Sequence, residues 1–467
     1  MGFLSGTTDG FFELPGGPVG YVVGGEYRRE DAFFQADQVI EDNLTFTNPL
    51  TQFNPERPFE VKEAFAEVDF PILSGVPFFE ELSFSAAGRV SDYTGPIGTT
   101  YAYNLGARWS PTPDLLFRAN YGRAVRAPNY TDTAGEPNVT FISVTDPCAS
   151  TRIDQGSEFR RANCEADLGA ILDDPGFQQV ANATVSTRGL NGNNPDLFEE
   201  ASISYTIGGV YQPSWLPGFA VTFDYYNIEV EDVIASVAGN TIIATCYDLP
   251  DLDNPFCGNF ERNGTGIGPE GEEPGQVLQG SILQSPLNFA SRIREGIDVD
   301  VSYRKSLSED VFVNARLLYT HVMTSSNFQD PTNPNFENRI LGELGDPQNQ
   351  FVFDLDLTFG AVTFGYGARY IGPQLTTSFE AQNPLNGQPP QNPDASFPLE
   401  YPETLYHDIR LAFQIEDAEG EPSFEFFGGV ENLLGTNPPL GLTGTGDGSA
   451  IFEVFGRRYF AGVRALF

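Results

Sequence analysis

The amino-acid sequence predicts an all-β fold, a transmembrane antiparallel up-and-down β-barrel. Two observations carry this prediction. Apolar and polar residues alternate with a period of two in segment after segment, which is typical of strands that present two different faces. The connections between these segments are alternately short and long, which is typical of barrels that cross an outer membrane.

The clearest alternation lies in residues 101–109, where the odd positions are aromatic or aliphatic and the even positions are small or polar. The same pattern predicts strands at 115–122, 219–226, 297–303, 311–319, 351–359 and 362–370, weaker strands beginning near residues 21, 60, 82, 201, 405 and 424, and a last strand at 459–467. We expect about 14 to 15 strands of roughly ten residues each, the length that crosses a bilayer at a tilt of about 45°.

Charged residues separate the two faces of these predicted strands. The apolar faces of the clear segments carry none, while the opposite faces carry Arg108, Arg118, Asp224, Asp298, Asp300, Arg316, Asp354, Asp356, Arg369 and Arg464. The polar face of a soluble sandwich would accept lysine freely, yet Lys62 and Lys305 are the only lysines among 25 basic residues. The pattern favours an apolar band against lipid around a polar lumen, in which the charges form lateral ion pairs.

The predicted connections alternate in length. Short ones lie at 71–80, 110–114, 211–217, 304–310, 360–361 and 416–422, and long ones at 30–58, 92–100, 124–198, 232–288, 323–349, 371–404 and 434–455. In an outer-membrane barrel the short turns are periplasmic and the longer loops are extracellular.

Composition excludes other classes of protein. A net charge of −39 over 467 residues repels phosphate backbones, which excludes nucleic acid as a partner. An aromatic content of 13% is too high for a disordered acidic chain. No run approaches the ~18–20 apolar residues of a membrane-spanning helix. The start of the chain lacks a secretion signal, so we expect either a cytosolic protein or a lost N-terminus.

The four cysteines form two local pairs, Cys148 with Cys164 and Cys246 with Cys257, and both pairs fall in the longest predicted outer loops. Metal-type spacing such as C-x₂-C is absent, and His321 and His407 are the only histidines. Two disulfides that staple the loops are therefore predicted, together with an oxidising compartment. No metal site and no cofactor are predicted.

Several motifs, in this order and spacing, resemble those of TonB-dependent outer-membrane receptors. Residues 109–130 resemble a periplasmic turn and a strand that ends in Arg126-Ala127-Pro128, and 194–202 resemble the next strand of that family, beginning at Asn194-Pro195. The Glu295-Gly296-Ile297-Asp298 and Glu431-Asn432 segments are similar to later family motifs. The C-terminus resembles the last strand of the family, whose assembly signal would be Tyr459, Ala461, Val463, Ala465 and Phe467.

The resemblance covers residues 1–467 and implies a receptor in the outer membrane of a Gram-negative bacterium. The family's barrel has about 22 strands and is filled by an N-terminal plug that contacts TonB. This sequence lacks recognisable counterparts of the plug, the TonB box and roughly the first seven strands. It is therefore predicted to be the C-terminal part of such a barrel, with residues 3–12 as the tail of a strand.

The resemblance also implies partners. These are outer-membrane lipid, TonB acting through a plug, the barrel-assembly machinery, and an unknown small ligand such as a siderophore, cobalamin, glycan or peptide. The plug would come from a missing N-terminus or another chain, and the lumen charges would face either that plug or a substrate route.

Simpler interpretations are available for several of these residues. Arg126 is expected to anchor the loop 124–198 rather than to contact ligand. The two histidines are expected to be incidental, and the loop acids Asp251, Asp253 and Glu261 to form a solvated surface rather than a calcium site. No catalytic motif is present, so an enzyme is not expected. The alternatives to the receptor are a porin-like passive channel without a plug and a secreted acidic β-rich binding protein or glycan hydrolase.

Overall fold

The computed structural model describes residues 1–31, 37–42, 44, 59–129, 132–133, 137–331, 333–394, 397–416, 422–439 and 451–465. Most of these residues belong to one 16-stranded sheet in which sequence neighbours pair antiparallel. In pairing order the strands are β1 (Gly2–Thr7), β4 (Gly20–Glu30), β5 (Phe59–Val76), β6 (Phe79–Tyr93), β7 (Thr99–Thr112), β8 (Leu115–Arg126), β11 (Glu200–Tyr211), β12 (Phe219–Ser236), β14 (Pro286–Ser306), β15 (Val311–Phe328), β17 (Asn349–Phe359), β18 (Val362–Ile371), β21 (Thr404–Glu416), β22 (Pro422–Glu431) and β23 (Arg458–Ala465), with β16 (Glu337–Arg339) paired to β15.

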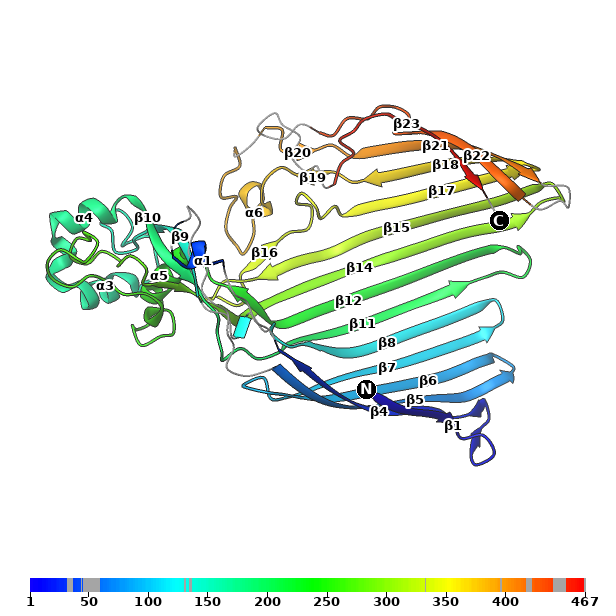
Figure 1. The fold of residues 1–467 in the computed structure, drawn as a ribbon, viewed down its shortest axis with the longest axis horizontal. Coiled ribbons are helices and arrows are strands. Elements are labelled where there is room, and N and C mark those ends of the chain that lie inside the picture. The colour runs from blue at the N-terminus through cyan, green and yellow to red at the C-terminus, as the bar shows by residue number, and fades with distance from the viewer. Residues whose placement is uncertain are drawn as a thin grey trace.

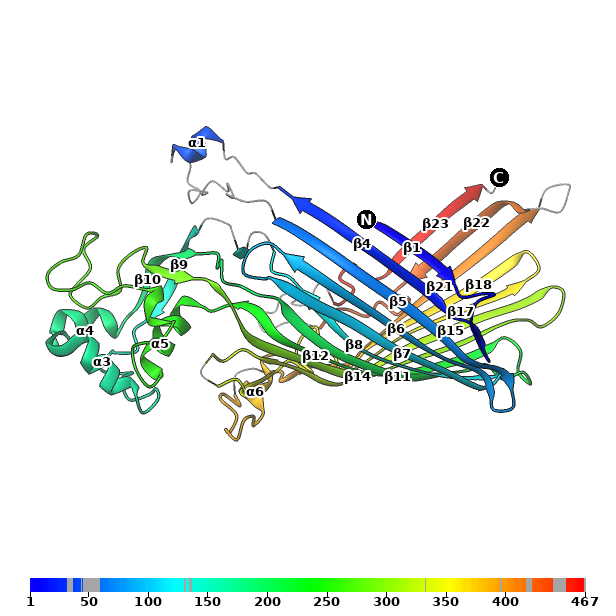
Figure 2. The same cartoon turned by 90° about the horizontal axis from the view of Figure 1, so that it is seen from below.

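The sheet is curved into a trough. In Figure 2 the middle strands β11, β12 and β14 lie lowest, and both edges, β1 with β4 and β22 with β23, rise on the same side. Within the described residues β1 and β23 are the two ends of the pairing path. The architecture is therefore an up-and-down meander, as the alternating pattern predicts.

Short turns gather at one end of the sheet and long connections at the other (Figure 1). We call these the turn end and the loop end. At the turn end the β2 (Glu13–Leu14) and β3 (Gly17–Pro18) hairpin joins β1 to β4. Two expectations need correction. The connection expected at 92–100 is short, since β6 ends at Tyr93 and β7 begins at Thr99. Several strands exceed the expected ten residues, because strands such as β14, with 21 residues, continue to pair beyond the alternating segment at the loop end.

Much of the two longest connections folds into a lobe beyond the loop end of β8, β11, β12 and β14 (Figure 1). We define the loop lobe as residues 137–192 and 237–285. It contains a three-stranded sheet of β9 (Asn138–Thr145), β10 (Thr184–Asn191) and β13 (Ile282–Gln284). Its helices are α3 (Arg160–Leu168), η1 (Gly169–Asp173), α4 (Pro175–Ala181), α5 (Gly239–Asp248) and η2 (Cys257–Asn259).

Smaller elements complete the loop end. They are α1 (Gln38–Glu41), α6 (Phe379–Gln382), β19 (Gln374–Leu375) and β20 (Glu400–Tyr401). No helix within the described residues combines the length and the apolar character needed to cross a membrane.

Candidate functional site: the charged face and the loop lobe

The strand register places all ten charges singled out in the sequence on one face of the sheet. Directly opposite residues of antiparallel strands point to the same side. Arg108 lies opposite Arg118, which lies opposite Gly208. Gly208 in turn lies opposite Asp224, and Asp224 lies opposite Asp298. The same reasoning, strand by strand, places the other six on this charged face, namely Asp300, Arg316, Asp354, Asp356, Arg369 and Arg464.

Most of these charges have lateral partners. Arg118 pairs with Asp224 at 2.5 Å, and Arg316 pairs with Asp300 at 2.8 Å. Arg108 and Arg464 pair at 3.4 and 3.5 Å with Glu81 and Glu425, two acids that the sequence did not single out. Thr320 donates to Asp298, and the Arg369 guanidinium lies 5.0 Å from the centre of the Tyr406 ring. Exposed pairs contribute little stability each, so their main effect is to satisfy charges on this face.

Gly208 makes the Arg118–Asp224 pair possible. The two charged residues lie on β8 and β12, and β11 runs between them with Gly208 at the crossing point. A Cβ at position 208 would collide with the Asp224 carboxylate. The side chains of Arg118 and Asp224 therefore meet over a backbone that carries no side chain of its own.

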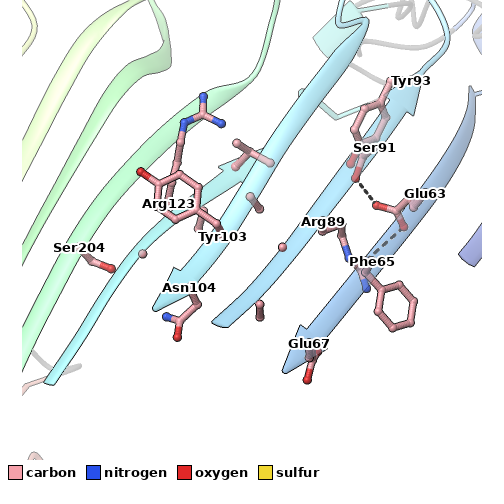
Figure 3. A pocket seen from close by; sticks show the side chains of 16 residues that line it. Glu63, Phe65, Glu67, Arg89, Ser91, Tyr93, Tyr103, Asn104, Arg123 and Ser204 are labelled. Atoms are coloured by element: carbon pink, nitrogen blue, oxygen red, sulfur yellow. Dashed lines mark hydrogen bonds and ion pairs between the residues drawn. The ribbon is translucent and has the colours of Figure 1, made fainter. Parts of the chain in front are cut away.

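A hollow of about 460 Å³ lies on the charged face over β5, β6, β7 and β8. Figure 3 shows Glu63, Arg89 and Ser91 side by side in this hollow, with interactions between them. Ser91 donates to Glu63 at 2.5 Å, Arg89 pairs with Glu63 at 3.2 Å, and the Arg89 guanidinium lies 5.1 Å from the Phe65 ring centre. This hollow can receive a polar ligand group through a cation, a carboxylate and an aromatic ring.

Other hollows lie on the same face. One is lined by Asp354, Asp356, Asp408 and Arg410 on β17 and β21, and another by Glu67 and Asp69 with their neighbours on β1 and β6. Polar residues of the charged face are closely packed, since Ser83, Ser91, Thr100 and Glu425 are only 7, 4, 1 and 6% exposed. Side chains converge on the inner side of a curved sheet, so the charged face is the concave side of the trough.

The opposite face is apolar and exposed. Leu411 is 57% exposed and Val463 is 60% exposed, although both are aliphatic. They belong to a band that continues across the sheet through Tyr101, Leu105, Trp109, Phe117, Tyr121, Ile207, Phe223, Phe364 and Phe426. An apolar surface of this extent needs a covering medium, because soluble monomers seldom expose more than a few hundred Å² in one patch.

Charges on the apolar face lie near the ends of the strands. Lys62 lies opposite Tyr27 and Asp92 near the loop end, and Lys305 lies opposite Val313 beside a short turn. Arg123 pairs with Glu199 at 3.6 Å. At the edges of an apolar band such side chains reach water while their stems cover apolar surface.

The two predicted disulfides staple the loop lobe. Cys148 bonds to Cys164 and Cys246 bonds to Cys257, and the described residues contain no free cysteine. The first bond joins the chain after β9 to α3, and the second joins α5 to η2. Both lie in or against a buried cluster that includes Ile142, Phe177, Ile243, Tyr247 and Ile282. The lobe thus has a hydrophobic core separate from the face of the large sheet.

A buried arginine connects several segments of this lobe. Arg262 is 7% exposed and donates two hydrogen bonds to Asp146, at 2.6 and 3.0 Å. It also donates to the Tyr247 hydroxyl at 2.6 Å, and Tyr247 donates to Asp167 at 2.5 Å. Burial alone would lower the pKa of Arg262, but the nearby Asp146 charge raises it, and burial raises the pKa of the Tyr247 hydroxyl. Arg262 therefore stays charged. No sequence pattern indicated this network.

The family-motif residues near the lobe stabilise its attachment. Arg126 donates two hydrogen bonds of 2.6 Å to Glu200. This pair joins the last residue of β8 to the first residue of β11, and the first segment of the lobe lies between these two residues in the sequence. Glu200 also accepts the Ile234 amide. Asn194 donates to the carbonyl of Pro286, and both Pro128 and the neighbouring Leu197 are buried. Pro195 follows Asn194 directly in this connection.

The two later motif residues have backbone roles. Gly296 follows a register shift between β14 and β15, and a Cβ there would lie 2.6 Å from the His321 carbonyl oxygen. Asn432 has a positive φ of 49°, and its buried side chain exchanges hydrogen bonds with Thr436. The backbone amide of Asn432 donates to the Asp408 carboxylate.

The histidines and loop acids take part in local contacts. Nδ1 of His321 lies 2.8 Å from Asn349, and Nδ1 of His407 lies 2.8 Å from the Tyr366 hydroxyl. Asp251 accepts the Asp253 amide. Across the described ranges, no group of three or more His, Cys, Asp or Glu residues is arranged to hold a metal ion.

Four of the predicted assembly-signal residues, Tyr459, Ala461, Val463 and Ala465, alternate along β23 on the apolar face, opposite Val430, Gly428, Phe426 and Phe424. Phe467 lies outside the described residues. Their role in assembly stays a prediction.

A meandering antiparallel sheet with one charged concave face and one apolar face defines a barrel-type membrane protein. The chain belongs to the TonB-dependent receptor family, because the family model "TonB dependent receptor-like, beta-barrel" matches residues 2–433. This is a family of transport receptors rather than enzymes, and its barrels lie in the outer membrane of Gram-negative bacteria. No curated protein matches the sequence significantly.

Solved structures share this fold at low sequence identity. The siderophore receptor PirA from Acinetobacter baumannii is 12% identical with a TM-score of 0.59, covering 100% of this chain and 54% of PirA. The ferric enterobactin receptor PfeA from Pseudomonas aeruginosa, solved as a mutant in complex with enterobactin, is 14% identical with a TM-score of 0.55, covering 96% of this chain and 52% of PfeA. The chain thus spans about half the length of the solved structures that it matches.

Proposed function

We propose that this chain is the C-terminal barrel portion of an outer-membrane receptor that imports a scarce small ligand with energy supplied through TonB. The observation that carries the proposal is the contrast between the two faces of one curved sheet. The concave face holds paired charges and polar hollows, and the other face exposes an apolar band suited to lipid. A water-filled or plugged lumen requires a polar face such as the concave one, and a bilayer requires an apolar face such as the opposite one.

In this proposal the long connections face the cell exterior, where oxidising conditions favour the two disulfides of the loop lobe. The lobe would take part in ligand capture, and the ligand would then pass along the charged face. A plug domain, supplied by a preceding segment or by another chain, would fill the lumen and transmit the action of TonB. The barrel-assembly machinery would insert the sheet, reading the alternating residues of β23.

The ligand class is part of the proposal. PirA is a siderophore receptor and PfeA is a ferric enterobactin receptor, so ferric siderophores are the first class to test, ahead of cobalamin, glycans and peptides. The hollow over β5–β8 supplies Arg89 as a cation for an anionic ligand group and Phe65 as a stacking surface.

The test uses the full chain in detergent and in planar bilayers. We expect it to partition into detergent, to migrate differently in gels before and after heating, and to bind ferric enterobactin saturably. Arg89→Ala should weaken this binding about tenfold, as loss of one charge-assisted contact does, while Lys305→Ala, which removes a cation of the apolar face beside a short turn, should not. A large open pore that ignores ligand would favour a passive channel and contradict the receptor, and a chain that is soluble and monomeric without detergent would contradict the membrane barrel.

A further inference from the structure

A hollow of about 390 Å³ lies on the charged face near the loop end of β17 and β18. Gly345 and Pro347, in the connection from β15 to β17, and Ile451, in the connection from β22 to β23, border this hollow. A Cβ added at Gly345 would lie 3.8 Å from Cδ1 of Ile451, so the two connections approach each other here. The volume of the hollow falls in the range of small-molecule sites.

The floor of this hollow is partly apolar, although it belongs to the charged face. Leu318 of β15 lies opposite Val352 of β17, and Val352 lies opposite Arg369 of β18. All three residues line the hollow, and the side chains of Leu318 and Val352 are exposed. This row therefore offers an apolar contact surface directly beside a cation.

Arg369 has no carboxylate partner among the described residues. The other four arginines predicted for the charged face all pair with carboxylates, namely Arg108, Arg118, Arg316 and Arg464. The chain holds 64 acidic residues against 25 basic ones, so an arginine left without an acid stands out. Its positive charge is available to an anion from outside the chain.

Tyr406 holds this cation in place. The Arg369 guanidinium lies 5.0 Å from the centre of the Tyr406 ring, and such a cation–π contact restricts the guanidinium to one position. The Tyr406 side chain is buried, and its hydroxyl accepts the amide hydrogen of Glu453 at 3.1 Å. The cation is thus positioned without being neutralised, and a positioned partner loses less entropy when a ligand binds.

The polar groups around the hollow leave room for a ligand. Asp346, which lies between two lining residues in the sequence, pairs with Arg294 at 2.9 Å. Asp298 accepts a hydrogen bond of 2.7 Å from Thr320, another lining residue. Gln350 lines the hollow, is exposed, and forms no side-chain hydrogen bond with a described residue. Its amide can therefore donate to the ligand that Arg369 binds.

We propose that this hollow binds a small organic carboxylate with an apolar body. The carboxylate accepts hydrogen bonds from Arg369 and Gln350, and the apolar body covers Leu318 and Val352. A guanidinium matches a carboxylate in a charge-assisted contact at two points. The proposal rests on the proposed function in one respect, namely that the concave face is open to water. It adds a second ligand site on strands other than those of the hollow over β5–β8.

Equilibrium dialysis of the full chain in detergent tests this site, with 2-naphthoate as the probe and protein-free detergent as the blank. At pH 7 we expect saturable binding of 2-naphthoate and about tenfold weaker binding of 2-naphthamide, which has the same rings without the charge. Arg369→Gln should weaken binding of 2-naphthoate about tenfold and leave binding of 2-naphthamide unchanged. Val352→Thr, which makes the floor more polar, should weaken binding of both probes about threefold.

Arg304→Gln is the matched control. Arg304 also lies on the charged face without an ion pair among the described residues, and its guanidinium lies 5.5 Å from the centre of the Phe312 ring. It is near the turn end, away from the hollow. The variant removes the same charge from the same face and should bind 2-naphthoate as the wild type does. Retained heat-modifiable migration establishes that each variant folds.

Three results would overturn the proposed site. They are the absence of saturable binding, equal binding of the two probes, and equal effects of Arg369→Gln and Arg304→Gln, which would show that the net charge of the face acts rather than the hollow. Binding of ferric enterobactin tests the receptor function separately. The carboxylate site can fail while that binding persists, and the reverse can also be observed, so the two failures are distinguishable.

Discussion

Gly208 is a residue whose missing side chain organises its surroundings. It allows Arg118 and Asp224 to meet across β11. We expect Gly208→Ala to destabilise the folded sheet by ~1–3 kcal/mol, because the added methyl group displaces the Asp224 carboxylate and separates the pair. The measurement is the urea midpoint of the heat-modifiable form in detergent.

Gly88 provides the matched control. It is also a strand glycine of the large sheet, in β6, and a Cβ there would meet nothing within 4 Å. Gly88→Ala should therefore leave the midpoint unchanged or raise it slightly. Equal losses for the two variants would contradict the role assigned to Gly208.

Arg262 joins Asp146 and Tyr247 inside the loop lobe. Arg262→Met leaves Asp146 buried and charged, and we expect a loss of about 3–5 kcal/mol in lobe stability. The double variant adds Asp146→Asn, which removes the unpaired buried charge and keeps an acceptor for the Cys148 amide. The double variant should therefore be more stable than Arg262→Met alone. Trypsin digestion in increasing urea measures the stability of the lobe in both variants. A double variant with a less stable lobe than the single variant would contradict the account.

The ten charges of the concave face show what could be predicted at the residue scale. Their common face follows from a period of two, which is a local property of each strand. The ion-pair partners of these charges do not follow from the period of two, because Arg118 and Asp224 are 106 residues apart and pair only through the register of three strands. Glu81 and Glu425 were missed for the same reason.

At the scale of elements, the disulfides fix the lobe and not the sheet. They close chain segments of 16 and 11 residues. Loss of a bond that closes about 15 residues costs about 3 kcal/mol in the chain-entropy account. The double variants Cys148→Ser with Cys164→Ser, and Cys246→Ser with Cys257→Ser, should therefore speed trypsin cleavage at Arg152 and Arg188 about tenfold or more.

The large sheet serves as the internal control for these variants. Its strands pair without either disulfide, so heat-modifiable migration should persist when the lobe is cut. Loss of that migration together with the disulfides would show that the lobe and the sheet fold as one unit.

The helices of the lobe could not be predicted from the sequence patterns. α3, α4 and α5 have seven to ten residues each and lie in segments rich in Gly, Asn, Asp and Pro, where no helical periodicity extends far enough to be distinguished. The cysteine pairs were the one signal that these connections have a fixed structure. A loop core assembled from two segments of the chain has no local signature.

At the scale of the whole molecule, the two lysines mark opposite ends of the sheet. Lys62 lies near the loop end of β5, and Lys305 lies near the turn end of β14, both on the apolar face. If the sheet crosses the outer membrane with its long connections outside, the two amines face different compartments.

The same two lysines measure membrane crossing directly. Cells that display the chain are treated with an amine reagent that cannot cross membranes, and each lysine is read by mass spectrometry before and after the outer membrane is permeabilised. The account predicts modification of Lys62 in intact cells and of Lys305 only after permeabilisation. Modification of both lysines to the same extent in intact cells, or protection of Lys62 with exposure of Lys305, would contradict it.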